Sequence, residues 1–374
     1  MRLDSGIIVL LSMAVLYGCA KKQDPLFSQG QEILFGPSVI VSGHSAETKA
    51  PLWPSSDISS FSLGGAYETN GFGVFACTTG EHTYRDVTVS ANFMCNQQVV
   101  FNDGNWMYSP VKYWPNGSEQ KLSFFAYAPY SDGDETSPLA NPVGYCIPSF
   151  SLPQDTGDPW VLYRLHPQMD KQVDLLYAAP LLNQMKLPLG RRLSFEFRHA
   201  LAQIGNVITV KCGDELKEDL RAEIPTVYDR VVLKVDELKV TYTLTSKARL
   251  VLWTSEETAN WESVESETVL TTREVTLISD SATLYEYDYS GGDPTESAPV
   301  VTIDDKACLF IPLELDGFPQ KAEFSVSLTA EFYQGLFMET KAGENKKSFL
   351  IKSLFYEAAE DGKILDMNLT IDKL

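Results

Sequence analysis

The chain has 374 residues, of which 44% are hydrophobic and 11% aromatic, and its 50 acidic and 30 basic residues give a net charge of -20. A chain this acidic repels nucleic acid and anionic lipid headgroups, so we expect no nucleic-acid partner. Its length exceeds what one hydrophobic core usually serves, and we therefore expect two domains.

The N-terminus has the pattern of a secretory signal. Arg2 leads into an apolar run from Ile7 to Tyr17, which is too short to cross a bilayer. The tetrad LYGC, which ends at Cys19, resembles a bacterial lipobox, in which the cysteine thiol takes the lipid. We therefore predict a lipoprotein signal peptide over residues 1–18, lipidation at Cys19 and a tether over residues 19–30. An ordinary signal peptide that contains a cysteine is the alternative.

The apolar run ILFGPSVIV, residues 33–41, predicts the first strand of the mature chain. Its apolar members are Ile33, Leu34, Phe35, Val39, Ile40 and Val41. A polar loop, SGHSAETKAP, follows it and contains a single lysine, Lys49, directly before Ala50. Loops of small polar residues are the segments that proteases prefer to cut.

Short segments rich in β-branched and aromatic residues dominate the rest of the chain, a pattern typical of buried or half-buried strands. The predicted strands are residues 72–77, 98–101, 121–127, 192–197, 206–211, 231–235, 238–244, 322–332 and 364–371. Residues 132–174 are rich in Pro, Gly and polar residues and predict a loop. Stacked antiparallel sheets would bury the apolar side of each strand, so the sequence predicts an all-β fold of two β-sandwiches in series.

Helical patterns are short, and the two best candidates are residues 199–204 and 214–223. The second is charged and separates two strand-rich halves, which places the expected domain boundary near it. We predict an N-terminal β-sandwich domain over residues 31–213 and a C-terminal β-sandwich domain over residues 214–374.

The cysteines and histidines show no metal-ligand spacing, and we expect neither a metal site nor a cofactor. Apart from Cys19 the cysteines are Cys77, Cys95, Cys146, Cys212 and Cys308. An odd number at wide spacing favours buried thiols, with one or two bridges left open for an exported protein. His199 is open to two interpretations, an acid/base cluster with Glu196 and Arg198 or, as we favour, a hydrogen bond to backbone at the end of a strand.

Residues 107–130, MYSPVKYWPNGSEQKLSFFAYAPY, contain seven aromatic residues. Side chains alternate along residues 121–127 and are large and apolar on both faces, which predicts a central strand. Residues 106–114, followed by the PNG turn at 115–117, are the predicted hairpin partner of this strand. The alternative is a surface that stacks on ligand sugars through Tyr108, Tyr113 or Trp114.

The block FMCNQQVVFNDGNWMYSPVKYWPNGSEQKLSFFAYAPY, residues 93–130, resembles the signature block of the fimbrillin-like family, the type V pilus subunits and associated lipoproteins of gut and oral anaerobes. FGVFA at 72–76, DLLYA at 174–178, LSFEFRHALAQIGNVITV at 193–210 and DGKIL at 361–365 also resemble this family. The resemblance implies two tandem transthyretin-like β-sandwich domains, export as a lipoprotein to the outer membrane surface, and no catalysis. In agreement, the sequence contains no GxSxG elbow, P-loop, HExxH motif or dinucleotide fingerprint.

The resemblance also implies a mode of assembly, in which a trypsin-like protease removes the first strand and a strand from a neighbouring subunit fills the groove. By its place after the first strand, the family's cleavage position corresponds to the Lys49–Ala50 bond. The alternative is an uncut surface lysine, since anchoring subunits keep this strand. The candidate donor strand is the terminal segment KILDMNLTIDKL, whose apolar side chains alternate at Leu365, Met367, Leu369 and Ile371. Pairing inside its own domain is the alternative for this strand.

The function implied by the resemblance is that of a structural pilus subunit that supports adhesion. Its expected partners are other pilus subunits, of its own or paralogous sequence, the outer membrane through the lipid anchor, and a host or bacterial surface ligand. The alternative is a surface lipoprotein that never polymerises and binds a glycan or host ligand through loops such as residues 132–158. An enzyme is a third class, for which the sequence offers no catalytic constellation.

Overall fold

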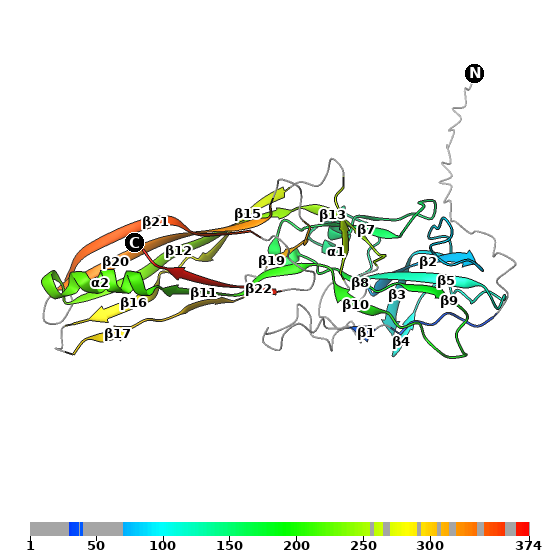
Figure 1. Ribbon diagram of the computed structural model, residues 1–374, viewed down its shortest axis with the longest axis horizontal. Coiled ribbons are helices and arrows are strands. Elements are labelled where there is room, and N and C mark those ends of the chain that lie inside the picture. Colours follow the sequence, from blue (N-terminus) through cyan, green and yellow to red (C-terminus); the bar gives the residue numbers. More distant parts are fainter. Residues whose placement is uncertain are drawn as a thin grey trace, which may run out of the picture.

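The computed structural model describes residues 30–36, 38–39, 70–254, 258–264, 270–289, 293–304, 308–313, 319–334, 340–355 and 364–373. These residues are mostly β-strands that gather in four sheets and build an elongated molecule (Figure 1). The all-β prediction is therefore confirmed. Among the described residues, no helix combines the length and the apolar character needed to cross a bilayer.

An eight-stranded sheet forms the first end of the molecule, on the right in Figure 1. In spatial order its strands are β1 (Ser38–Val39), β10 (Glu196–His199), β8 (Leu176–Ala178), β5 (Lys121–Ala128), β2 (Phe72–Gly80), β3 (Met94–Asn102) and β4 (Asn105–Met107), with β9 (Leu181–Gln184) also paired to β5. The prediction of a central strand over residues 121–127 is confirmed, because β5 lies between β8 and β2. Phe124 on one face and Phe125 on the other are both fully buried.

The predicted hairpin between residues 106–114 and 121–127 is wrong. β4 pairs with β3 instead, and the two strands are joined by Asp103 and Gly104 with φ angles of 50° and 78°. Two successive positive φ angles are the geometry of a tight hairpin turn, and Asp-Gly is a sequence that readily adopts it. The chain therefore turns back directly after β3, before it reaches the PNG turn.

A four-stranded sheet brings together strands from distant parts of the chain. Its order is β14 (Asn260–Glu262), β13 (Lys247–Val251), β7 (Trp160–Arg164) and β6 (Ser149–Phe150). Helix α1 (Pro142–Cys146) and the 3-10 turn η1 (Met169–Lys171) flank β6 and β7 in the chain. The composition of residues 132–174 predicts a loop, but the structure shows that this range also contains a helix, two strands and a 3-10 turn. Val161 and Tyr163 of β7 are buried, but Pro and Gly around this short strand conceal its alternation in the sequence.

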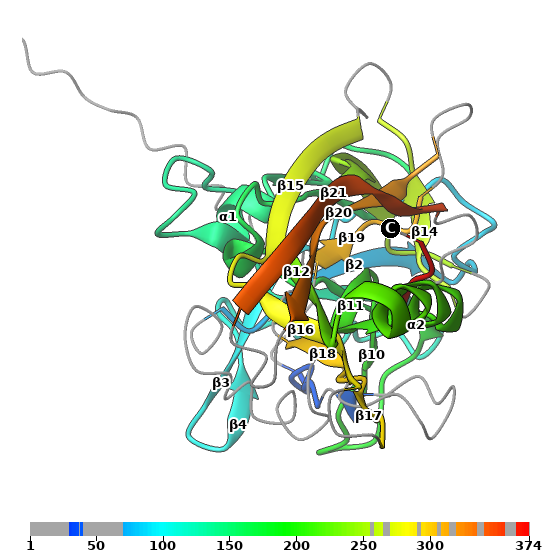
Figure 2. The same ribbon diagram turned by 90° about the vertical axis from the view of Figure 1, so that its left-hand side faces the viewer.

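Two further sheets form the second end, on the left in Figure 1. One contains β17 (Thr295–Ser297), β16 (Ala282–Asp288), β12 (Arg230–Thr245), β20 (Lys321–Gln334) and β21 (Thr340–Phe355), with β15 (Leu270–Ile278) also paired to β12. The other contains β18 (Val301–Asp304), β11 (Ala202–Cys212) and β19 (Cys308–Phe310), with β22 (Ile364–Ile371) also paired to β11. Figure 2 looks along the molecule from this end and shows β11 and β12 inside it, with helix α2 (Asp214–Val227) at one side.

Of the two predicted helices, residues 214–223 are confirmed as part of α2, whose Leu216 and Leu220 are buried. The helix predicted over residues 199–204 is wrong, because β10 ends at His199 and β11 begins at Ala202. Pairing of β11 with β19 and β22 determines the conformation there, and such tertiary pairing overrides weak helix propensity.

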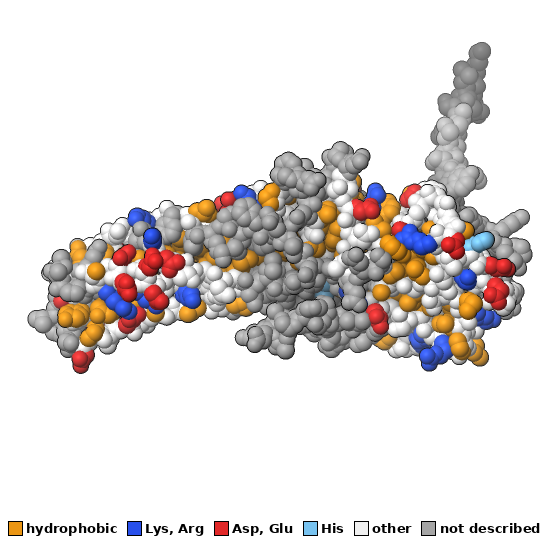
Figure 3. All heavy atoms as spheres, in the orientation of Figure 1, with side chains coloured by type: hydrophobic (Ala, Val, Ile, Leu, Met, Phe, Trp, Pro, Cys, Tyr) orange, Lys and Arg blue, Asp and Glu red, His pale blue; other side chains and the backbone are white. Residues whose placement is uncertain are grey.

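A continuous core of buried side chains extends from Phe125 in the first end to Leu369 in the second. A smaller core lies on the other face of the eight-stranded sheet and contains Ile33 and Phe35. The division into transthyretin-like domains at residue 213 stays a prediction. β11 precedes this position, whereas its partners β18, β19 and β22 all follow it. On the face shown in Figure 3, acidic and basic side chains are interspersed at both ends.

Candidate assembly site

The N-terminal segment, residues 31–39, of which the structure describes 31–36 and 38–39, runs along the eight-stranded sheet and enters it as β1. On one side Glu32 forms an antiparallel bridge with Tyr113. On the other side the segment runs parallel to residues 193–197, first through a bridge between Phe35 and Leu193 and then through pairing of β1 with β10. The segment thus has a backbone neighbour on each side, as a strand inside a sheet has.

Hydrogen bonds join the segment to its antiparallel neighbour. The backbone N–H of Ile33 donates to the carbonyl of Lys112 at 3.0 Å, and the N–H of Trp114 donates to the carbonyl of Gln31 at 3.0 Å. The hydroxyl of Tyr108 also donates to the carbonyl of Ile33, at 2.8 Å. Tyr108 and Trp114 are both buried, so the sugar-stacking alternative does not hold for these two rings.

Hydrogen bonds also join the segment to its parallel neighbour. The N–H of Gly36 donates to the carbonyl of Leu193 at 2.8 Å, and the N–H of Leu193 donates to the carbonyl of Leu34 at 2.7 Å. The guanidinium of Arg192 donates to the carbonyl of Phe35 at 3.1 Å. Both edges of the segment are therefore engaged, and its removal would leave unpaired donors and acceptors on two neighbours.

Two side chains of the segment, Ile33 and Phe35, are fully buried. Burying an aliphatic or phenyl side chain of this size contributes about 1.5–3 kcal/mol. The ring of Phe35 contacts the rings of Phe72, Tyr108, Phe124 and Phe195 at centroid distances of 5.3–6.2 Å. Without the segment, the sheet would present a trough with an aromatic floor.

The C-terminal strand β22 runs parallel to β11, with a register shift between Ile204 and Ile208 of β11. In the part of the chain that the structure describes, β22 pairs with β11 alone and is therefore an edge strand. The apolar residues Met367, Leu369 and Ile371 are 5%, 1% and 1% exposed.

β22 is thus paired within its own chain, which is the alternative that the sequence left open. Leu365 forms part of β22, but its side chain lies outside the description. Cys19, Lys49, Ala50, Ile40 and Val41 lie outside the described residues altogether, and only the backbone of Val39 is described. Lipidation, cleavage and strand donation therefore stay predictions.

His199 forms a buried ion pair that the sequence interpretation missed. Its Nδ1 lies 2.5 Å from Oδ2 of Asp174, and both side chains are buried. Burial alone would lower the pKa of His199, but the charge of Asp174 and the hydrogen bond to it outweigh burial and raise this pKa. Glu196 and Arg198 alternate with His199 along β10 and point to the other face, so they form no acid/base cluster with it. The predicted hydrogen bond from His199 to backbone is therefore wrong, because the partner is the side chain of Asp174. The ion pair links the end of β10 to the residues just before β8.

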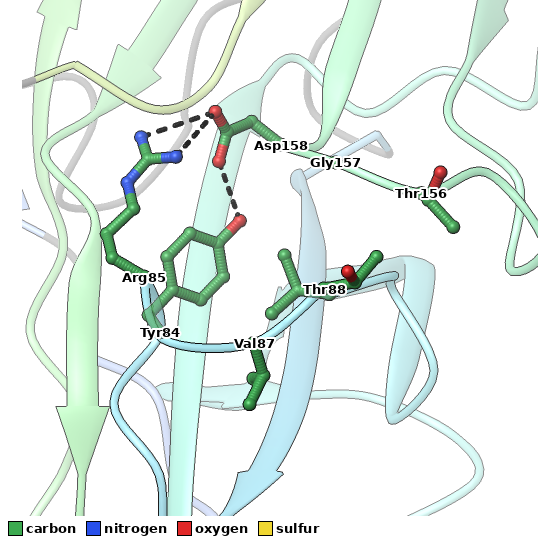
Figure 4. Close-up of a pocket in the computed structure, with 8 residues that line it drawn as sticks. Tyr84, Arg85, Val87, Thr88, Thr156, Gly157 and Asp158 are labelled. Carbon is green, nitrogen blue, oxygen red and sulfur yellow. Dashed lines mark hydrogen bonds and ion pairs between the residues drawn. The ribbon is translucent and has the colours of Figure 1, made fainter.

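A pocket of about 270 Å³ lies beside residues 84–89 and 156–158. Figure 4 shows Tyr84 and Arg85 pointing toward Asp158. The hydroxyl of Tyr84 donates to Oδ1 of Asp158 at 2.9 Å, and the guanidinium of Arg85 donates to Oδ2 at 3.3 Å. Burial raises the pKa of Tyr84, so its phenol stays protonated. Because both carboxylate oxygens already accept hydrogen bonds, the arrangement is typical of a structural cluster.

The cysteines of the described region, Cys77, Cys95, Cys146, Cys212 and Cys308, are free thiols, so no bridge joins any two of them. Burial raises the pKa of Cys77 to about 12 and that of Cys308 to about 11. Thiols with such raised pKa values form little thiolate and react slowly. Within the described ranges, no three His, Cys, Asp or Glu side chains are grouped closely enough to hold a metal ion.

Comparison with known proteins places the chain in a family. The sequence profile of the fimbrillin-like proteins matches residues 64–291, which is more than half of the chain. The chain belongs to the fimbrillin-like family. This fimbrillin-like chain is 26% identical over 182 residues to the fimbrium subunit Fim1C of Phocaeicola vulgatus, a match that covers 44% of the chain and 46% of that protein. It therefore spans about half the length of this curated relative.

The fold is also similar to that of a solved protein. A crystal structure of a fimbrial protein from Bacteroides vulgatus superimposes on the fimbrillin-like chain with a TM-score of 0.55 at 18% identity. The superposition covers 91% of this chain and 95% of that one. At this identity the likeness shows the fold alone.

Proposed function

We propose that this chain is a subunit of a cell-surface fimbrium that assembles by strand exchange and supports adhesion. In this proposal the chain is exported as a lipoprotein, anchored through Cys19 to the outer membrane and cut between Lys49 and Ala50. Residues 31–39 then leave the sheet, and a strand from another subunit takes their place. The observation that supports the proposal is the position of this segment between two backbone neighbours, with Ile33 and Phe35 buried in the aromatic trough.

A cut in the loop after the segment would change how firmly it is held. In the intact chain, the covalent connection keeps the segment at a high effective concentration beside its groove, so it rebinds quickly after any opening. After the cut, noncovalent contacts alone would hold it, among them its hydrogen bonds and the burial of Ile33 and Phe35. A strand with a longer apolar face could then displace it.

β22 has the properties of such a strand. Its alternating residues Met367, Leu369 and Ile371 present one apolar face, and it lies at an edge of its own sheet. It runs parallel to β11, just as residues 31–39 run parallel to residues 193–197. A donated β22 would therefore meet a groove that already accepts a parallel strand. We propose no catalytic role and no cofactor.

Cleavage is tested by the N-terminal residue of protein sheared from the cell surface of the native host. We expect Ala50 as the N-terminus of the wild-type protein and retention of Cys19 in Lys49→Ala. Lys186→Ala is the matched control, because Lys186 is an exposed loop lysine in the N-terminal half of the sequence, and this variant should be cut like the wild type. A wild-type N-terminus that stays at Cys19 would contradict cleavage.

Donation is tested by deleting residues 365–374 and examining filaments by electron microscopy and the monomer by circular dichroism. We expect filaments to disappear while a folded monomer remains. Because this deletion also removes buried side chains, a second measurement adds a peptide of residues 361–374 to cleaved monomer whose N-terminal segment has been removed. A rise in the melting temperature with peptide supports donation. If the deletion variant does not fold and the peptide has no effect on the melting temperature, the intramolecular role of β22 is favoured. If the wild-type protein stays monomeric after cleavage, the lipoprotein that does not polymerise is favoured.

A further inference from the structure

A second pocket, of about 310 Å³, lies near the middle of the molecule. Its lining includes Tyr145 of α1, Arg164 at the end of β7, Lys247 at the start of β13, and Thr271 and Arg273 of β15. Figure 1 shows that these elements come together where the two ends of the molecule meet. The pocket is therefore built by segments from both halves of the chain.

The pocket concentrates positive charge in an acidic protein. Three of its lining residues are cations, whereas the described residues that line it include no Asp or Glu. Arg164 is held in place, since its guanidinium donates to the carbonyl of Tyr145 at 2.9 Å and lies 3.8 Å from the centroid of the Tyr145 ring. Arg164 also pairs with the carboxylate of Glu135 at 2.8 Å. The side chain of Glu135 is 54% exposed and does not line the pocket. Although the whole chain has a net charge of -20, the local positive charge of this pocket attracts anions.

Among the described residues, one buried nitrogen atom of the pocket lining and one of the adjacent His166 have no hydrogen-bond partner. Within the described residues, Nη1 of Arg273 and Nε2 of His166 are buried and form no hydrogen bond. Nδ1 of His166 lies 3.0 Å from the backbone nitrogen and 3.2 Å from the carbonyl oxygen of Gln168. The His166 ring contacts the ring of Tyr145, a lining residue, at 4.9 Å. Nη1 of Arg273 can only donate, and a buried donor without an acceptor is costly to the protein.

The chemistry of the pocket defines the ligand that fits it. Guanidinium groups have N–H donors and no acceptor, and they bind carboxylate or sulfate oxygens strongly. The volume exceeds by far the roughly 30 Å³ that a water molecule occupies, and is large enough for a sugar ring. The ring of Tyr145 and the ring of Pro167 offer apolar contacts, and Ser246 and Thr271 offer hydroxyl groups. We propose that this pocket binds one acidic sugar residue, with its carboxylate or sulfate at Arg273.

Calorimetric titration of the full chain tests the ligand class. The probes are glucuronate, galactose 6-sulfate, inorganic sulfate and neutral glucose. We expect one of the two acidic sugars to bind, which identifies carboxylate or sulfate as the recognised group, and glucose not to bind. Inorganic sulfate that binds as tightly as the sugars would overturn the recognition of a saccharide, and equal binding or no binding of glucose and both acidic sugars would overturn the proposal.

Variants test the position of the site. Arg273→Gln keeps a polar, unbranched side chain, shortens it and removes its charge, and we expect affinity to fall about tenfold or more. Arg230→Gln is the matched control, because Arg230 also lies on a strand and pairs with Glu286 at 2.7 Å, but lies outside the pocket, so it should bind like the wild type. If Arg273→Gln melts at a lower temperature, Lys247→Gln provides a second reading of the same site. Wild-type affinity in both Arg273→Gln and Lys247→Gln would overturn the proposal.

Discussion

Each end of the described chain runs parallel to another segment of the same chain, but the two ends are held in different ways. Residues 31–39 have backbone neighbours on both sides and bury Ile33 and Phe35. Within the described residues, β22 pairs with β11 alone, and it buries Met367, Leu369 and Ile371. Loss of the first segment would leave a gap between residues 112–114 and residues 193–197, whereas loss of β22 would remove backbone partners from β11 alone. A gap with two edges offers more hydrogen bonds to a replacement strand than a single edge does.

The largest expected effect comes from Phe35→Ala, because Phe35 is fully buried among four aromatic rings. We expect the free energy of unfolding of the uncut protein to fall by about 3–5 kcal/mol, measured by urea denaturation. The matched control is Leu34→Ala, since Leu34 is only partly buried on the same segment. Equal losses in the two variants would show that the aromatic trough does not hold the segment.

The ion pair of Asp174 and His199 lies at the end of β10, the strand that pairs with β1. Its removal tests how much this buried pair contributes to the stability of the region that holds the N-terminal segment. Asp174→Asn removes the charge that stabilises buried, protonated His199, and we expect a loss of about 3 kcal/mol. Because the folded pKa of His199 is raised, the stabilisation is present below the ordinary histidine pKa of about 6.5 and is lost as pH rises through the folded pKa.

The difference between Asp174→Asn and wild type, measured by thermal unfolding, should therefore be larger at pH 6 than at pH 9. The control is Asp170→Asn, whose carboxylate is 75% exposed beside Lys171 and should matter little. A difference that stays constant from pH 6 to pH 9 would contradict the charged pair.

Glu331 of β20 tests a region of the second end away from both chain ends. Its carboxylate accepts hydrogen bonds from Lys234, Lys341 and Tyr333, which lower its pKa to about 2. Its stabilising effect is present above the ordinary glutamate pKa and is lost as pH falls through about 2. Because both lysines are about a third exposed, at 32% and 38%, solvent screens the pairs.

We expect Glu331→Gln to cost about 1 kcal/mol at pH 7 and less near pH 2, measured by urea denaturation. Release of residues 31–39 from cleaved protein should be unchanged in this variant. Faster release would show that the two ends of the molecule are coupled, which would weaken the contrast between them.

The smallest effect is expected on the outer face of β22. The hydroxyl of Thr209 donates to the side-chain oxygen of Asn368, which is exposed. Asn368→Ala should cost no more than about 1 kcal/mol in thermal unfolding of the monomer. Leu369→Ala, on the buried face, should cost about 2–5 kcal/mol. Similar costs for the two variants would mean that β22 is not held by its apolar face.

The sequence predicted those strands that carry their own pattern. Residues 364–371 alternate cleanly and form β22 with these bounds, and the apolar groups on both faces of residues 121–127 indicated a central strand. Residues 231–235 and 238–244 were predicted as two strands, and they form the single strand β12. Its pairing with β20 shifts register between Val235 and Glu237, where the predicted strands were separated.

Contacts between distant residues could not be predicted from pattern. His199 and Asp174 are 25 positions apart, and only the pairing of β10 with β8 brings them together. The position of residues 31–39 depends in the same way on residues 112–114 and 193–197, which no local signal connects. The turn at Asp103 and Gly104 does have a local signal, because the Asp-Gly pair favours a tight hairpin turn as the PNG sequence at 115–117 also does.

The direction of the long strands has a mechanical consequence. Figure 1 shows β12, β20 and β21 lying along the longest dimension of the molecule. A pulling force applied from end to end would act along these strands, so the hydrogen bonds between β12 and β20 would bear the load together and not open one after another. Because the continuous core also extends from Phe125 to Leu369, the same force would have to slide packed side chains past one another. The architecture is therefore suited to resist tension along its length.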